Sequence, residues 1–334
     1  MGKWIKSALL SLAMLTTASH ADVGTNYLLA TASTGGTYYP VGVALATLTK
    51  VKIQPKHGVS ISAINSAGSA ENVKLLREQE AQFAILQGLY GAYAVEGSGP
   101  LESEGEQQYL RSITMLWQNV EQFIVKKEHA KQGDLSDLQA LVGEKMALGK
   151  KNSGTIGSNR FLLGNLGINI DEQMDLFSAG YGPSAEALQN GQVEGVNTPA
   201  GVPTGAVTKL FAAAADDIQP LTVTDAQVAE VNGGMSLWTR YLIPANTYPG
   251  QSEDWPTIAQ PNFLAVHQDV DEEFVYLLTK TIYENLGFLQ AIHKATNAMA
   301  LEKALAGLPA PLHPGAARYY REAGLTIPDN LVAQ

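Results

Sequence analysis

The chain has 334 residues, of which 45% are hydrophobic and 16% charged, and its formal net charge is -10. This length allows a sizeable core and two domains, whereas the acidic balance argues against binding to nucleic acid or to anionic membrane surfaces. The chain contains no cysteine, which excludes disulfides, zinc–thiolate sites and thiol nucleophiles.

Residues 1–21 have the pattern of a secretory signal peptide, with two lysines, an apolar run at 8–15 and small residues before a cleavage point. The run is far shorter than the roughly 20 residues that span a bilayer. Cleavage after Ala21 would leave Asp22 first, so a lipid-modified cysteine is not expected. It would remove two lysines and no acids, giving a charge of 20 − 32 = −12. We therefore expect a soluble protein of the bacterial periplasm.

The most informative segment follows, where an apolar, strand-like run at 27–30 leads through two glycines into a helical pattern at 41–51. Thr37 stands where a helix cap belongs, and Pro40 falls in the first helical turn. Glycine lets a backbone approach a ligand closely, and the first N–H groups of a helix have no partner within it. The segment therefore indicates an anion-binding turn.

Two further strands end in similar polar segments. A strand predicted over 59–64 is followed by a small-residue turn and a helix over 70–78, with Ser69 as its cap. A third strand, over 81–87, ends in Gln87. Ligands of open α/β sheets bind at the carboxyl ends of strands, so we expect these segments to lie side by side at one sheet edge.

The middle of the chain predicts a second α/β unit. An acidic stretch at 96–108 is typical of a surface loop, and a hinge is expected between the strand-like runs that follow it. Polar, glycine-bearing turns then join further strands and helices, as in the first unit. Two such units with facing turns describe a cleft that binds a small molecule. The elements from the hinge onward are strands at 110–117, 121–127, 145–149, 174–178 and 193–198, a helix at 156–166, and turns at 150–155 and 179–184.

The turns place hydroxyl donors at helix starts, which suits an acidic ligand, although no arginine lies in them to clamp a carboxylate. Lys150 and Lys151 could add positive potential, but adjacent lysines are more often solvated surface charge. Tyr181 is equally acceptable as a ligand contact and as a core residue. The candidate ligand-binding residues are Ser33, Thr34, Gly36, Thr37, Tyr38, Ser66, Ser69, Gln87, Asn152, Ser153, Thr155 and Tyr181.

Catalytic motifs are poorly matched. The segment 143–151 has five residues between its glycines, where a P-loop has four, and Pro183 interrupts a loose dinucleotide fingerprint. The five histidines of the mature chain stand singly, without the spacing of a metal pair. We therefore expect no enzyme activity, no cofactor and no bound metal. A periplasmic hydrolase or transferase on an α/β scaffold is the remote alternative.

Six segments, in the same order along the chain, resemble TAXI-type solute-binding proteins, the extracytoplasmic receptors of one class of tripartite ATP-independent periplasmic (TRAP) transporters. The resemblance implies a type II-like, two-lobed periplasmic binding protein that closes on a solute like a Venus flytrap and delivers it to a sodium-coupled permease. Known members favour glutamate, glutamine and related small carboxylates, so it also implies such a ligand. The segments are 34–42 (TGGTYYPVG), 67–72 (AGSAEN), 80–87 (EAQFAILQ), 153–155 (SGT), 243–250 (IPANTYPG) and 312–320 (LHPGAARYY).

Two turns depart from the family's pattern. Ala32 and Ser33 replace the earlier of two Gly-Gly pairs, and residues 66–69 read Ser-Ala-Gly-Ser where Thr-Gly-Gly-Ser is common. Both changes lie in presumed binding turns, so they bear on the identity of the ligand more than on the fold.

Because the chain must cross between lobes and return, we expect a first lobe from about 22–117 and 261–334 and a second lobe from 118–260. The expected partners are a small carboxylate, namely glutamate, glutamine or a related dicarboxylate, and the membrane permease subunits of a TRAP transporter. We expect a monomer. A receptor of an ABC importer, which has the same lobed architecture, is the alternative.

Overall fold

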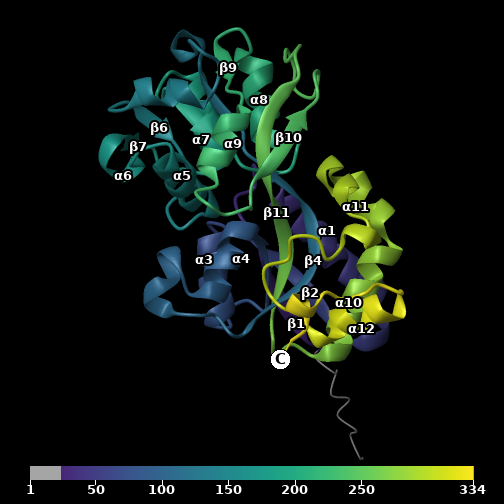
Figure 1. Cartoon of the computed structure of the whole chain (residues 1–334). Helices are drawn as coiled ribbons and strands as arrows, with labels where there is room; N and C mark the ends of the chain where they lie inside the picture. Colours follow the sequence, from purple (N-terminus) through teal and green to yellow (C-terminus); the bar gives the residue numbers. More distant parts are fainter. Residues whose placement is uncertain (1–23, 334) are drawn as a thin grey trace, which may run out of the picture.

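Residues 24–333 are described by the computed structural model, and the predicted signal peptide at 1–21 lies outside this range. The chain forms two α/β lobes joined by two long strands, β4 (Leu110–Val120) and β11 (Trp255–His267) (Figure 1). No helix in the described range is long and apolar enough to cross a membrane.

The first lobe, drawn lower in Figure 1, contains the N-terminal elements and the helices that follow β11. After α1 the chain runs on as a π-helix over Thr49–Ile53, so the helical segment is longer than predicted. The elements of this lobe are β1 (Asn26–Ala30), α1 (Tyr38–Leu48), α2 (Gln54–His57), β2 (Ser60–Ile64), α3 (Ser69–Arg77), β3 (Phe83–Gln87), α4 (Gly88–Glu96), α10 (Glu272–Glu284), α11 (Leu286–Ile292) and α12 (Pro314–Glu322).

The second lobe, drawn upper in Figure 1, contains the elements between the two long strands. Four of its strands, β5 to β8, lie within predicted runs and are shorter than predicted, whereas β9 and β10 were not predicted. The elements are β5 (Phe123–Lys126), β6 (Lys145–Ala147), α5 (Gly154–Asn165), α6 (Ile170–Gln173), β7 (Asp175–Leu176), α7 (Tyr181–Gln189), β8 (Gly195–Asn197), α8 (Gly205–Ala214), β9 (Ile218–Pro220), α9 (Asp225–Val231) and β10 (Thr239–Ile243).

Both sheets are mixed. In one, β1 pairs in parallel with β2 and β3, β11 continues antiparallel to β3, and the order is β10-β11-β3-β1-β2 with β4 on β11. In the other, the order is β7-β6-β8-β5-β9, with parallel pairing around β6 and antiparallel pairing around β5. The alternating strands and helices read from the sequence therefore form α/β lobes, as predicted.

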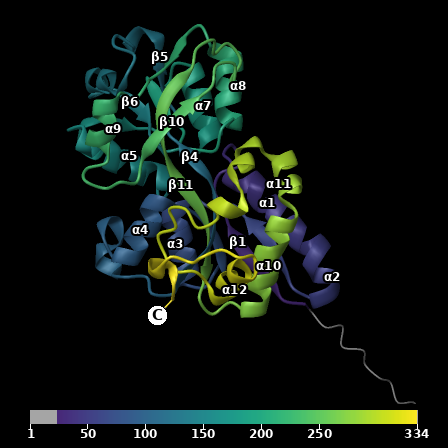
Figure 2. The same ribbon diagram turned by 45° about the vertical axis from the view of Figure 1, so that its right-hand side comes forward.

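The crossing strands pair with each other in antiparallel register from Leu110 opposite His267 to Val120 opposite Ala259. The paired strands run from one lobe into the other (Figures 1 and 2). The predicted lobe boundaries, after 117 and before 261, fall inside these strands, so the residue limits of the lobes stay a proposal. The hinge predicted at 118–120 falls within β4 and not between two strands, and its position stays a prediction.

Each lobe has an apolar core of its own. Phe83, Phe263 and Tyr320 are among the largest buried side chains of the first lobe, and Phe123 and Trp238 among those of the second. Helices α10 and α12 pack on each other and on β4, so the C-terminal helices complete the first core. Because each lobe has its own core and the two are joined by a strand pair, a ligand is expected to bind at the surfaces between the lobes.

The start of α10 carries a capping aspartate, because the Asp271 side chain accepts a hydrogen bond from the backbone N–H of Phe274 at 2.8 Å. Asp271→Ala should lower the free energy of unfolding by about 1 kcal/mol, since the N–H group loses its partner. Asp271→Asn keeps an acceptor and should retain most of the stability. Chemical unfolding compares the two, and equal losses would contradict the capping role.

Candidate functional site

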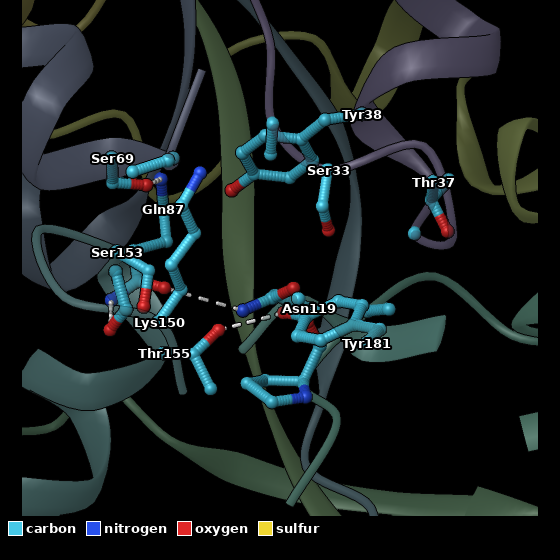
Figure 3. Close-up of a pocket in the computed structure, with 18 of the residues that line it drawn as sticks. Ser33, Thr37, Tyr38, Ser69, Gln87, Asn119, Lys150, Ser153, Thr155 and Tyr181 are labelled. Atoms are coloured by element: carbon cyan, nitrogen blue, oxygen red, sulfur yellow. Dashed lines mark hydrogen bonds between the residues drawn. The ribbon is translucent and has the colours of Figure 1, made fainter. Parts of the chain in front are cut away.

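The candidate site is a pocket between the lobes, lined by the beginnings of four helices (Figure 3). Helices α1 and α3 come from the first lobe, and α5 and α7 come from the second. The ends of β3 and β4 contribute Gln87 and Asn119. The pocket offers about 40 Å³ to the centres of water-sized atoms. One water needs roughly 10–15 Å³ on that measure, so only a small molecule fits.

Nine of the twelve candidate residues line this pocket, and three lie elsewhere. Thr34 lines a neighbouring cavity together with His293. Ser66 is buried, and its hydroxyl bonds the backbone oxygen of Thr31 at 2.9 Å within the first lobe. Asn152 lines a groove beside the pocket. The nine that line the pocket are Ser33, Gly36, Thr37, Tyr38, Ser69, Gln87, Ser153, Thr155 and Tyr181.

Direct hydrogen bonds hold the lobes together around the pocket. The Gln87 amide nitrogen donates to the backbone oxygen of Gly154 at 3.0 Å and to the hydroxyl of Ser158 at 2.8 Å. The Thr37 hydroxyl donates to the backbone oxygen of Gly201 at 3.0 Å. The described conformation is therefore closed, and several candidate residues connect the lobes as well as lining the pocket.

Two predicted helix caps are wrong, for the same physical reason. Thr37 stands before α1, but its hydroxyl bonds the opposite lobe and makes no capping bond. Ser69 is the first residue of α3, and its hydroxyl accepts from the backbone N–H of Gln87 at 3.1 Å. In both cases a partner distant in sequence has replaced the local one. Ser153, in contrast, caps α5 by accepting from the N–H of Ile156 at 3.2 Å.

The hydroxyl groups differ in what they can offer a ligand. Tyr181 donates its single proton to the backbone oxygen of Pro199 at 2.7 Å, so the 2.7 Å bond between Thr155 and Tyr181 takes its proton from Thr155. Burial raises the pKa of Tyr181 well above its usual range, which keeps the phenol neutral. Ser153 accepts a bond as a cap, and its own proton stays available for an anion.

Two pocket residues were missed or undervalued in the sequence. Lys150, interpreted as surface charge, is exposed and yet lines the pocket, and Figure 3 shows its side chain extending along the pocket wall. Lys151 lines the neighbouring groove instead. Asn119 sits on a crossing strand, where no turn motif marks it. Of the two residues, only Lys150 could have been predicted from the sequence, because it stands three residues before the helix cap Ser153.

The charged groups and dipoles that face the pocket are all positive. Among the described residues that line it, Lys150 is the only charged one and none is acidic. The positive ends of four helix dipoles add to the same sign. An anion is therefore stabilised in this pocket, and a cation is not.

One carboxylate–imidazole cluster lies away from the pocket, at the outer end of β5. Glu128, His129 and Glu194 each offer one atom within 4.8 Å of the others, although the histidine spacing had suggested no metal geometry. The His129 ring nitrogen lies 2.7 Å from one Glu194 oxygen, and the Lys126 ammonium lies 2.7 Å from the other. Glu194 is thus already paired on both oxygens, and the cluster is an ion-pair network.

Two α/β lobes that close on a pocket lined from both sides define a two-lobed periplasmic binding protein fold, as predicted. The chain belongs to the NMT1-like family, whose model matches residues 29–324.

Solved structures with this fold cover most of the chain. MatC from Rhodopseudomonas palustris, solved with bound malate, superposes with a TM-score of 0.56 at 15% identity, covering 89% of this chain and 98% of MatC. The periplasmic binding protein BugD gives 0.53 at 13% identity, covering 90% and 94%. A protein from Bordetella bronchiseptica RB50 gives 0.52 at 17% identity, covering 90% and 81%. At these identities the likeness concerns the fold.

Proposed function

We propose that the protein is a periplasmic solute receptor that binds a small carboxylate between its lobes and delivers it to a TRAP-type, sodium-coupled permease. The observation that carries the proposal is the charge of the pocket, where four helix starts and Lys150 meet without an acid among the described lining residues. Helix starts favour anions through their dipoles and their free N–H groups.

The side chains that line the pocket are suited to binding a ligand and not to converting it chemically. Its described lining residues include no histidine, aspartate or glutamate that could act as a general base toward Ser33, Ser69 or Ser153. A ligand in this pocket contacts both lobes only when they are closed. It therefore binds the closed form more tightly than the open form, and this difference in affinity shifts the equilibrium toward closure. A closed, ligand-loaded monomer is the form we expect the permease to receive.

The NMT1-like family match and the binding-protein fold support the receptor role. The TAXI-like segments support the TRAP assignment, and the signal-like residues 1–21 support export to the periplasm. The bound malate in MatC is a property of that protein, and it accords with a carboxylate ligand for this fold.

The test is a thermal-shift screen of residues 22–334 against small mono- and dicarboxylates, followed by calorimetry. A ligand at a hundredfold excess over its dissociation constant should stabilise the protein by about 2.7 kcal/mol, and it should be recovered chemically unchanged. In vesicles with the cognate permease, uptake should require a sodium gradient. Uptake driven by ATP would instead assign an ABC importer, and a product in place of the ligand would contradict the receptor role.

Lys150 and Lys151 form a matched pair for testing the pocket. Lys150→Met should weaken carboxylate binding about tenfold, because an ammonium that contacts the anion contributes roughly 1.5 kcal/mol. Lys151→Met should leave the affinity unchanged, because Lys151 lines the neighbouring groove. Calorimetry at fixed ionic strength measures both, and equal effects of the two substitutions would remove Lys150 from the site.

A further inference from the structure

We propose that the preferred ligand is a hydroxycarboxylate, and that the side-chain carbonyl oxygen of Asn119 recognises its hydroxyl group. This inference rests on the proposed carboxylate receptor and narrows its ligand class. The observation behind it is that Asn119 is 2% exposed, lines the pocket, and has a side-chain oxygen with no hydrogen-bond partner in the described structure.

A chain of hydrogen bonds fixes which end of the Asn119 amide is free. The backbone oxygen of Gly154 can only accept, so Gln87 must turn its nitrogen toward it, at 3.0 Å. The Gln87 oxygen then faces Asn119, which directs its own nitrogen to that oxygen at 3.5 Å. The Asn119 oxygen is left without a donor. Figure 3 shows this amide among the residues that line the pocket.

A buried acceptor without a donor is costly, which is why buried polar atoms are nearly always paired. A ligand that fills this pocket satisfies Asn119 only if it carries an N–H or O–H group at that point. Plain mono- and dicarboxylates carry none when ionised, so a carboxylate group alone does not complete the site.

The positive charge of the pocket indicates whether the ligand group that donates to Asn119 is an ammonium or a hydroxyl group. An ammonium would be enclosed with Lys150 and four helix starts, and no described lining residue is an acid that could pair with it. The buried Glu121 does not line the pocket, and its two oxygens accept from Trp238 at 3.0 Å and Asn197 at 2.8 Å. A neutral hydroxyl donor avoids the penalty, so the pocket favours hydroxy acids over the amino acids that the family resemblance implied.

Three matched triads of ligands test this directly by calorimetry on residues 22–334. Each triad differs only in the group on carbon 2, which is hydroxyl, hydrogen or ammonium. The triads are lactate, propionate and alanine; malate, succinate and aspartate; and 2-hydroxyglutarate, glutarate and glutamate. In the triad of the right length, the hydroxy acid should bind about 10- to 100-fold more tightly than the unsubstituted acid, and at least tenfold more tightly than the amino acid.

Substitutions at Asn119 test whether its side chain accepts the hydrogen bond from the hydroxyl group of the ligand. Asn119→Leu should abolish the advantage of the hydroxy acid, and Asn119→Asp should move the preference toward the amino acid by supplying the missing negative charge. Lys150→Met is the control, because it should weaken the hydroxy acid and the unsubstituted acid alike and so keep the ratio of their affinities. Equal affinity for hydroxy and unsubstituted acids, or tightest binding of the amino acid, by the unmodified protein would overturn the inference while leaving a carboxylate receptor. Binding of no carboxylate in any triad would overturn both.

Discussion

Replacing Gly154 with valine should weaken ligand binding by at least a hundredfold while leaving the folded protein intact. A Cβ atom at this position would lie 2.7 Å from the Gln87 side-chain oxygen and 2.9 Å from the Ser69 hydroxyl, both on the opposite lobe. Gln87 cannot move aside freely, because its nitrogen is bonded to Gly154 and Ser158. The substitution therefore blocks closure, and a ligand held from both lobes loses its contacts with one of them.

Gly164 provides the matched control, since it lies on the same helix and nothing approaches its missing side chain within 4 Å. Gly164→Val should keep the wild-type affinity. Calorimetry gives the affinities, and circular dichroism with thermal unfolding checks that both variants fold. If Gly154→Val binds as tightly as Gly164→Val, the closed lobe contact is not part of the bound state.

The buried Glu121 should lower the free energy of unfolding by about 3 kcal/mol as the pH rises from about 4.5 to 7. Burial raises the pKa of the Glu121 carboxyl to about 7, against lowering contributions from hydrogen bonds with Asn197, Trp238 and Gln260. In this window the folded protein keeps a proton that the unfolded chain releases, so folding becomes less favourable with rising pH. Above pH 7 the full cost of a buried carboxylate is present.

Glu121→Gln isolates this effect because it removes the titration and keeps an oxygen for the Trp238 N–H group. Urea unfolding at pH 5, 6, 7 and 8 should show the stability of the variant rising relative to the wild type as the pH increases. Burial or partial burial lowers the pKa of His267, His293 and His313, which change stability in the opposite direction, but these histidines are common to both proteins. Parallel pH profiles for the two proteins would show that Glu121 does not titrate in this range.

The sequence was most informative where a local pattern and the tertiary structure agree. The glycine-bearing turns after β1 and before α5 predicted helix starts, and both helices begin within a few residues of the predicted positions. The prediction of Ser69 as a cap was wrong because its hydroxyl is held by β3, which a local pattern cannot reveal. Asn119 had no signal at all, since its place in the pocket depends on the pairing of β4 with β11.

Lys150 illustrates a different limit. Its exposure was predicted, and the side chain is indeed exposed, but exposure and contact with the pocket turn out to be compatible at the mouth of an interlobe site. Gln87 shows another limit, because it was proposed as a ligand-binding residue from its place at the end of a predicted strand, and it does line the pocket. In the closed structure its amide nitrogen is fully used by the opposite lobe, so its main task is to join the lobes.

The pairing of β4 with β11 also makes it possible to delete or exchange the second lobe as a unit. Val120 and Ala259 are direct neighbours in that pairing, so the chain leaves for the second lobe and returns from it at a single point. The second lobe is in this sense a continuous insert with adjacent ends. A short turn joining 120 to 259 would bypass it without stretching the backbone, and the same two positions are suitable junctions for exchanging the insert between receptors of this fold.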